Sequence, residues 1–260
     1  MGLLQTTIFG NGVLNLDIDA KNFIDAALIT DINHKKAINS LVIKLKSDNL
    51  WTKLQAIYPF VGGSDFSHKF NLKSPIDDDL SFRITYSGTL NHDYRGIVHL
   101  GGFAFTQFRM DTNSIINNFH WSSYNSVDTF AYLFQSGLCQ FFPKITIGSD
   151  ISVLSDMYDA TGGNARVTAV NPNGNARGHF IASRTLTSTR HAIYKNGNLL
   201  NFKNATAGTL NNVNVQIGSS ASTSGAITSF ATIGVGLSDT DSANLYNAIQ
   251  SFQTRLGRQV

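Results

Sequence analysis

The spacing of apolar residues is helical near both ends of the chain and strand-like between them. A first helix is expected from about Ala20. Two stripes then recur at intervals of three and four residues, as on one helix face: Ile38, Leu41, Val42 and Leu45, then Leu50, Trp51, Leu54, Ile57 and Tyr58. We predict one helix capped by Thr30 or Asp31 and another ended by Pro59, because proline lacks the N–H that a continuing helix needs.

From about Leu80 to Val235 apolar and polar residues alternate with period two, which predicts short, half-buried strands. The candidate strands are 82–86, 103–108, 119–124, 130–134, 165–170, 179–185, 191–194, 213–217 and 230–234. Asn196-Gly197 predicts a tight hairpin, because both residues accept the positive φ of its turn. Many short strands without helical spacers favour an antiparallel sandwich over a parallel α/β sheet.

The chain closes with another helical pattern. Ser238 and Asp241 form a capping box with aspartate in place of glutamate, and Gly257 marks the end of the helix. Its apolar stripe consists of Leu245, Ala248, Ile249, Phe252 and Leu256. The predicted fold class is mainly β: an antiparallel jelly-roll sandwich with an N-terminal helical segment and a C-terminal closing helix. We expect an extended arm at 1–19, a helical segment at 20–63, and a sandwich domain at 64–260 whose closing helix spans 238–257.

The composition narrows the possible chemistry. All seventeen acidic residues are aspartate, because the sequence contains no glutamate. Glycosidases that use paired glutamates and metalloproteases of the HExxH type are therefore excluded. Charged residues make up only 14% of the chain, and no dense stripe of Lys and Arg supports nucleic-acid binding. No apolar run approaches the roughly 20 residues of a membrane helix, so no membrane partner is expected.

The residue types that carry catalysis or bind metals form no recognisable motif. Cys139 is the only cysteine, and its apolar neighbours predict a buried, inert thiol. The run Asp77-Asp78-Asp79 lacks the spacing of a calcium loop and predicts a solvated turn. The seven histidines show no HxH or HxxxH spacing, and there is no P-loop, GxGxxG or GxSxG motif. We therefore assign no catalytic, metal or cofactor-binding residue and expect no cofactor.

Two weaker possibilities remain open. Aromatic side chains on a sandwich face can stack on sugars, and the candidates are Trp121, Tyr124, Tyr132 and Tyr158. At period-two spacing, however, such residues more often belong to the core. A hydrolase that depends on aspartate would need two opposed carboxylates, such as Asp156 and Asp159.

Two flanking segments resemble structural proteins of tailed bacteriophages. The first runs from Phe23-Ile24-Asp25-Ala26-Ala27 to Ala56-Ile57-Tyr58-Pro59-Phe60-Val61-Gly62-Gly63, with His68-Lys69-Phe70-Asn71-Leu72-Lys73 after it. The second runs from Ile233-Gly234 through Gly236-Leu237-Ser238-Asp239 to Leu256-Gly257-Arg258. Between them, Tyr194-Lys195-Asn196-Gly197 is similar to a hairpin of laminin-G-like, concanavalin-A-like jelly rolls.

The resemblance implies a non-enzymatic structural or decoration component of a phage particle, on its tail, baseplate or head surface. Such a protein would be a homo-oligomer, would contact other virion proteins, and would assemble into the virion in the host cytoplasm. The arm at 1–19 is the expected contact with neighbouring subunits. Relatives of the sandwich bind glycans, often with Ca²⁺, so the alternative is a carbohydrate-binding adhesin that recognises host surface glycans. A polysaccharide depolymerase that depends on aspartate is the third hypothesis.

Overall fold

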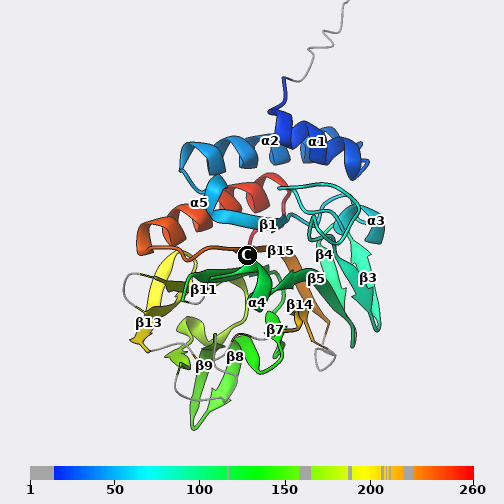
Figure 1. Ribbon diagram of the computed structural model, residues 1–260. Helices are drawn as coiled ribbons and strands as arrows, with labels where there is room; N and C mark the ends of the chain where they lie inside the picture. The colour runs from blue at the N-terminus through cyan, green and yellow to red at the C-terminus, as the bar shows by residue number, and fades with distance from the viewer. Residues whose placement is uncertain are drawn as a thin grey trace, which may run out of the picture.

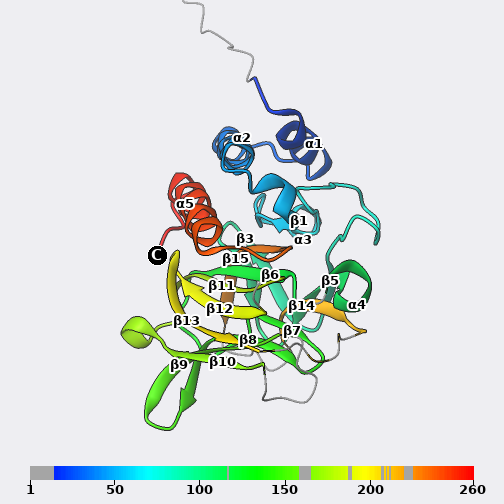
Figure 2. The same cartoon turned by 60° about the vertical axis from the view of Figure 1, so that its left-hand side comes forward.

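The computed structural model describes residues 15–115, 117–157, 165–186, 189–205, 208, 210, 212–219 and 225–260. A layer of helices lies on an eight-stranded sheet, and that sheet lies on a seven-stranded sheet (Figures 1 and 2). Every pair of named strands is antiparallel. The predicted mainly β sandwich with an N-terminal helical segment and a closing helix is confirmed.

The helical layer consists of α1 (Ile18–Ala26), α2 (Ile32–Ser47) and α5 (Asp239–Arg255). The Asp31 carboxylate accepts hydrogen bonds from the main-chain N–H groups of Asn33 and His34, both at 2.8 Å, and so caps α2. Ser238 and Asp241 form the predicted capping box of α5. Gly257, with φ +65°, follows the end of this helix. The capping residues predicted for both long helices are confirmed.

The eight-stranded sheet is the middle layer. Its strands run in the order β13-β12-β11-β6-β15-β4-β3, and β1 pairs with the second half of β15. Their bounds are β1 Leu54–Tyr58, β3 Leu90–Asp93, β4 Gly96–His99, β6 Phe119–Asn125, β11 Gly178–Thr185, β12 Arg190–Lys195, β13 Asn198–Asn204 and β15 Ala226–Gly234. Strands β6 and β15 are buried at every position, because the helices cover one face of this sheet and the second sheet covers the other.

The outer sheet has the order β10-β9-β8-β7-β14-β5-β2. Its strands are β2 Thr85–Ser87, β5 Phe103–Arg109, β7 Phe134–Ser136, β8 Cys139–Ile147, β9 Asp150–Asp156, β10 Val167–Val170 and β14 Asn214–Gly218. In β5 the buried positions alternate with partly exposed ones, as in a strand with one solvated face. The short helices are η1 Trp51–Lys53, α3 Asp65–His68, α4 Met110–Asn113 and η2 Pro172–Gly174.

Two hydrophobic cores follow from the three layers. One lies between the helices and the middle sheet and contains Phe23, Leu41, Phe252 and the ring of Tyr124. The other lies between the two sheets and contains Trp121. Residues on the two faces of β6 therefore pack in different cores, which explains why this strand has no solvent-exposed face.

The helix predicted over Leu50–Tyr58 is wrong. Only the short turn η1 is helical there, and residues 54–58 form β1. Leu54 and Ile57 pack in the core under the helices, whereas Ala56 and Tyr58 pack between the sheets. Because both faces of the strand are buried, its apolar residues follow no alternation, and their spacing matches a helix by coincidence.

Three other predicted strands are shorter than expected. Of residues 165–170 only 167–170 belong to β10. Of residues 82–86 only 85 and 86 belong to β2, and Phe82 has a φ of +56° that interrupts the extended backbone. Of residues 130–134 only Phe134 belongs to β7. Residues 1–14 of the predicted arm lie outside the described residues, and α1 begins at Ile18, inside its predicted range. The division into arm, helical segment and sandwich domain stays a prediction.

The hairpin predicted at Asn196-Gly197 is confirmed. It joins β12 to β13, with Lys195 paired to Asn198. Asn196 has φ +51° and Gly197 has φ +76°, as the turn requires.

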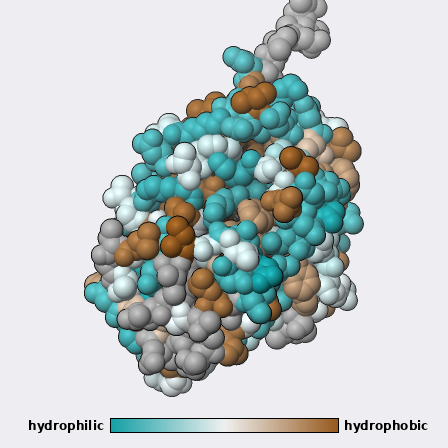
Figure 3. Space-filling model, in the orientation of Figure 1, coloured by the Kyte–Doolittle hydropathy of each residue, from teal (hydrophilic) through white to brown (hydrophobic). Residues whose placement is uncertain are grey.

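The face of the molecule seen in Figure 3 is mainly hydrophilic, with apolar side chains scattered over the helices and the sandwich. In the described part of the chain, no helix combines the length and the apolar character needed to cross a membrane.

Candidate functional site

The aromatic residues proposed from the sequence do not form a sugar platform. Trp121 and Tyr124 are fully buried. The Trp121 ring stacks on Phe134, with 5.4 Å between the ring centroids, inside the core between the sheets. Tyr132 is half-buried against Phe142, at a centroid distance of 4.0 Å. Tyr158 lies outside the described residues.

The acidic candidates have structural partners. Both oxygens of the buried Asp156 carboxylate accept from the Arg166 guanidinium at 2.8 Å, and Asp159 lies outside the described residues. Asp77 is ion-paired with Lys69 at 2.5 Å and with Arg83 at 3.1 Å, so this turn is held by cationic side chains. Within the described ranges, no group of three or more His, Cys or Asp side chains is arranged to hold a metal ion.

Most of the buried histidines are also structural. His99, His120 and His191 each place Nδ1 against a main-chain carbonyl and Nε2 against a hydroxyl, at 2.6–3.1 Å. A neutral imidazole satisfies both contacts, because it donates through one nitrogen and accepts through the other. Burial lowers the pKa of His99 and His120 to about 4 and that of His191 to about 3. The Cys139 thiol is buried, as predicted.

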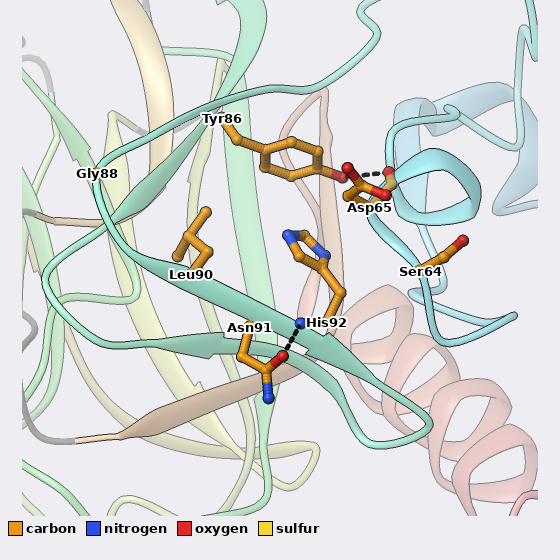
Figure 4. Close-up of a pocket in the computed structure, with 7 residues that line it drawn as sticks. All are labelled: Ser64, Asp65, Tyr86, Gly88, Leu90, Asn91 and His92. Atoms are coloured by element: carbon orange, nitrogen blue, oxygen red, sulfur yellow. Dashed lines mark hydrogen bonds between the residues drawn. The ribbon is translucent and has the colours of Figure 1, made fainter.

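A polar hollow lies where the chain crosses from the edge of one sheet to the edge of the other. Strand β2 ends the outer sheet, β3 ends the middle sheet, and Gly88 turns between them with φ +73°. A Cβ at Gly88 would lie 2.6 Å from the carbonyl oxygen of Gly101, so the turn requires glycine. The hollow has a volume of about 390 Å³. It is lined by Ser64, Asp65, Tyr86, Gly88, Leu90, Asn91 and His92 (Figure 4).

Three segments of the chain position its side chains. The Tyr86 hydroxyl donates to the main-chain carbonyl of Asp65 at 3.0 Å and ties β2 to the start of α3 (Figure 4). Ser64 caps α3 by accepting from the N–H of Ser67 at 3.1 Å. The imidazole of His92 meets the Tyr86 ring edge-on, with 4.6 Å between the ring centroids. Burial raises the pKa of Tyr86 well above its ordinary value, so this hydroxyl stays protonated.

A second histidine, His68, forms a hydrogen bond with the His92 ring. The Nδ1 atoms of His68 and His92 are 3.1 Å apart, so one of them donates and the other accepts. His68 is buried, and burial lowers its pKa to about 3. Burial also lowers the pKa of His92, although the nearby charges of Asp65 and Asp93 raise it in part. Both rings are therefore neutral at pH 7, and the His68 contact fixes the orientation of His92.

The groups that remain for a ligand are polar and neutral apart from one carboxylate. The Asp65 side chain is exposed and accepts from its neighbour Phe66 through a single oxygen, Oδ1. The exposed Asn91 amide accepts from the N–H of His92 at 3.0 Å and keeps its NH₂ group for another contact. Together with the half-buried Tyr86 ring, these groups suit hydroxyl-rich ligands, which both donate and accept hydrogen bonds. Asp65 is the only acidic side chain among the lining residues, so this hollow holds no pair of carboxylates.

Sequence reasoning missed this site. Tyr86 fits the alternation of a half-buried strand, and nothing in that pattern separates a pocket wall from a core residue. The local signal is the polar run Asn91-His92-Asp93 directly after the Gly88 turn. The contribution of Asp65, twenty-one residues before Tyr86, depends on the fold.

No family model matches the chain, and no curated protein matches it either. Three solved structures illustrate what it is similar to. Domain 4 of an extracellular GH43 arabinanase from Geobacillus stearothermophilus, in complex with arabinotriose, is 14% identical over 74% of this chain and 98% of that domain, with a TM-score of 0.46. A heptameric SAP-like pentraxin from Limulus polyphemus is 10% identical over 49% of this chain and 69% of its own, with a TM-score of 0.33. A Trypanosoma rangeli sialidase is 12% identical over 83% of this chain and 39% of its own, with a TM-score of 0.43.

These likenesses are too distant to assign the chain to a family or to a function. None of the three structures is described as a phage protein. The resemblance of the flanking segments to phage proteins therefore stays a prediction.

Proposed function

We propose that this protein binds neutral glycans through the hollow between β2, β3 and α3. The observation that carries the proposal is the meeting of the Tyr86 ring, the Asp65 carboxylate and the neutral His92 imidazole in one hollow of about 390 Å³. A sugar ring presents both an apolar face and hydroxyl groups. It would pack against Tyr86 while its hydroxyls bond to Asp65 and Asn91.

The elements that position the lining side chains also support the proposal. Tyr86 and His92 stand on edge strands of two different sheets, and the hydrogen bond from the Tyr86 hydroxyl to the Asp65 carbonyl joins β2 to α3. The scaffold holds such a site rigid, which lowers the conformational entropy that the protein loses when a glycan binds. A kinship with laminin-G-like or concanavalin-A-like sandwiches, expected from the Asn196-Gly197 hairpin, agrees with this role.

A glycan array probed with the full chain tests the proposal, followed by calorimetric titration with the best neutral oligosaccharide. We expect Tyr86→Ala and Asp65→Asn to weaken binding at least about tenfold, a loss of about 1.4 kcal/mol each. Tyr86→Phe keeps the ring and should lose less than Tyr86→Ala. The matched control is Asp150→Asn, which removes one exposed carboxylate at the start of β9.

Thermal unfolding of each variant shows whether it is folded. The proposal fails if the array shows no neutral glycan bound. It also fails if Tyr86→Ala and Asp65→Asn, while folded, bind as tightly as the Asp150→Asn control.

A second proposal is that the protein is a structural or decoration component of a phage particle. The two segments that carry the resemblance, 23–73 and 233–258, form one unit in space. Leu54 pairs with Gly234 in the middle sheet, and the Lys53 ammonium contacts the Asp241 carboxylate at 2.6 Å. Helix α2 packs against α5 in the core under the helices. The resemblance therefore concerns a single packed unit instead of two unrelated helices.

Mass spectrometry of purified particles from the source of this sequence tests the second proposal, with light scattering of the isolated chain for its oligomeric state. The expected result is the chain in stoichiometric amount in the particle. Its absence from particles that are otherwise complete would reject this role without affecting the glycan proposal.

A further inference from the structure

Two neighbouring hollows beside the C-terminal residues share a wall. The first, of about 240 Å³, lies against the β3–β4 turn and the start of β15. The second, of about 460 Å³, lies against the β12–β13 hairpin. Gln259 and Val260 line both of them. Neither hollow shares a lining residue with the one in Figure 4. The two hollows therefore adjoin at Gln259 and Val260, and the surface that they make up is separate from the proposed glycan site.

Arg177 is the cation of this surface that a ligand can reach. The cationic lining residues of the surface are Arg95, Arg177, Lys195 and Arg258, and none of its lining residues has an acidic side chain. Arg95 is neutralised by Asp93 at 2.6 Å. Lys195 and Arg258 are buried, and both donate their hydrogen bonds to acceptors within the protein. The nearby charge of Arg177 lowers the pKa of the Asp128 carboxyl, and the charge of Asp128 raises the pKa of Lys195 in part. The Asp128 carboxylate is ion-paired with Lys144 at 3.0 Å. The exposed Arg177 guanidinium is therefore the group of this surface that can bind an anionic ligand.

Lys195 fixes the shape of the second hollow. Its ammonium group donates to the Asn171 side chain at 2.8 Å and to the main-chain carbonyls of Pro172 at 3.1 Å and Asn175 at 2.9 Å. These contacts hold the loop around η2 in place, where Asn173 has φ +61°. Asn173 and Asn175 of this loop line the hollow. The Asn175 side-chain oxygen accepts from the main-chain N–H of Arg177 at 3.1 Å, which leaves its NH₂ group to donate. Burial lowers the pKa of Lys195 to about 8, so the group is still charged at pH 7.

Two exposed side chains, one in each hollow, are free to meet a ligand. Tyr94 lines the first hollow and is 67% exposed. Arg177 lines the second hollow, is exposed, and makes no ion pair with the described residues. Gln259 lines both hollows, and Ser126 lines the first.

We infer that this surface is a second binding site, for an acidic oligosaccharide that bears carboxylate groups. The sugar ring packs on Tyr94, the amides of Asn173, Asn175 and Gln259 bond to hydroxyls, and the Arg177 guanidinium binds a carboxylate in bidentate fashion. The amide-rich lining favours a sugar over a nucleic acid, whose regular phosphates call for a denser row of cations. The inference does not depend on the proposed function, because the two sites share no residue.

The test uses the full chain and a short oligomer of a hexuronic acid, with its methyl ester as the neutral counterpart. Calorimetric titration at an ionic strength of about 0.02 M should show binding of the acid and at least about tenfold weaker binding of the ester. Raising the ionic strength to about 0.15 M shortens the Debye length to about 8 Å and should weaken the binding of the acid. Oligosaccharides with sialic acid extend the panel to a second carboxylate sugar.

Variants locate the site. Arg177→Gln and Tyr94→Ala should each weaken binding of the acid at least about tenfold. Lys36→Gln removes one positive charge from an exposed position of α2 and should leave this binding unchanged. Tyr86→Ala, in the hollow of Figure 4, should also leave it unchanged. Thermal unfolding confirms that each variant is folded.

Three outcomes overturn the inference. The first is that no carboxylate-bearing oligosaccharide binds, and the second is that acid and ester bind equally. The third is that single-stranded DNA or an aspartate-rich peptide binds more tightly than every acidic sugar, with the same loss in Arg177→Gln. Failure of this test leaves neutral glycan binding at Tyr86 untouched, because that site is measured with different ligands and variants.

Discussion

The guanidinium of Arg258 donates to the main-chain carbonyl of Phe60 at 2.8 Å, across 198 positions of sequence. Its other N–H groups meet oxygens of Pro59, Tyr94, Ser229 and Gln253. All five donors of the buried side chain are thus satisfied, and none of the acceptors is a carboxylate. Burial lowers the pKa of Arg258 to about 9. This one residue joins the C-terminal segment to β15, to the β3–β4 turn and to the end of β1.

Replacing Arg258 should therefore be costly. We predict that Arg258→Gln lowers the free energy of unfolding by at least about 3 kcal/mol, because several buried carbonyls lose their partners. Urea denaturation followed by tryptophan fluorescence measures it. The control is Arg255→Gln, an exposed position in the last turn of α5, for which we expect a loss below about 1 kcal/mol. Equal stabilities of the two variants would contradict the role given to Arg258.

Stability should fall steeply in mild acid. Burial lowers the pKa of His68, His179 and His191 to about 3 and of His99 and His120 to about 4. An unfolded histidine titrates near 6.5, so below that pH the unfolded chain binds more protons than the folded one. Each such histidine then removes about 1.4 kcal/mol of stability per pH unit, down to its folded pKa. Denaturation curves between pH 8 and pH 5, above the range where aspartates titrate, should show this loss. It should begin as the pH falls through about 6.5, the pKa of an unfolded histidine. A flat profile would reject it.

His179 should contribute to that loss without stabilising the fold at neutral pH. Neither of its ring nitrogens has a hydrogen-bond partner among the described residues. Its ring stacks between Tyr124 and Tyr246, at centroid distances of 6.4 Å on both sides. His179→Phe keeps the stacking and removes an unsatisfied polar group, so we predict equal or higher stability at pH 8 and a larger gain at pH 5. His120→Phe, which breaks the bonds to Val235 and Thr232, should be destabilising at pH 8. Thermal melts at the two pH values compare them.

The closing helix should be indispensable. Leu245, Ile249 and Phe252 are buried against the middle sheet and α2, and each contributes about 1.5–3 kcal/mol as a gross upper figure. Deleting residues 238–260 also removes Arg258. We predict an insoluble or molten product, detected by loss of the near-UV circular dichroism of the full chain. A soluble truncation with an unchanged near-UV spectrum would disprove this.

The features that were predictable from the sequence are those with a local cause. Asp31, Ser238 and Asp241 act through hydrogen bonds within their own first helical turn, and Asn196-Gly197 fixes its own turn geometry. The layer order was not accessible, because it depends on which surface covers each strand. Leu54–Tyr58 illustrates the point: a strand buried on both faces has no alternation to reveal it.

The candidate site was not predictable for a related reason. Asp65, Tyr86 and His92 come from a short helix and from edge strands of two sheets, and only the packing of those sheets brings them together. Period-two spacing places Trp121 and Tyr124 on opposite faces of β6, and the structure shows that both of these faces are covered. Burial, which separates a core aromatic from a binding aromatic, is a property of the finished fold.

The pairing of β1 with β15 has a consequence for synthesis. Leu54 and its partner Gly234 leave the ribosome far apart in time, because at about 5–20 residues per second the intervening chain takes roughly 10–35 s to make. Until β15 arrives, β1 and one edge of β6 lack their partners in the middle sheet, and the apolar faces of α1 and α2 lack α5. The nascent chain therefore carries open strand edges and uncovered apolar surface for most of its translation. We expect this protein to depend on chaperones that hold such chains, and to fold as a unit only after β15 and α5 emerge.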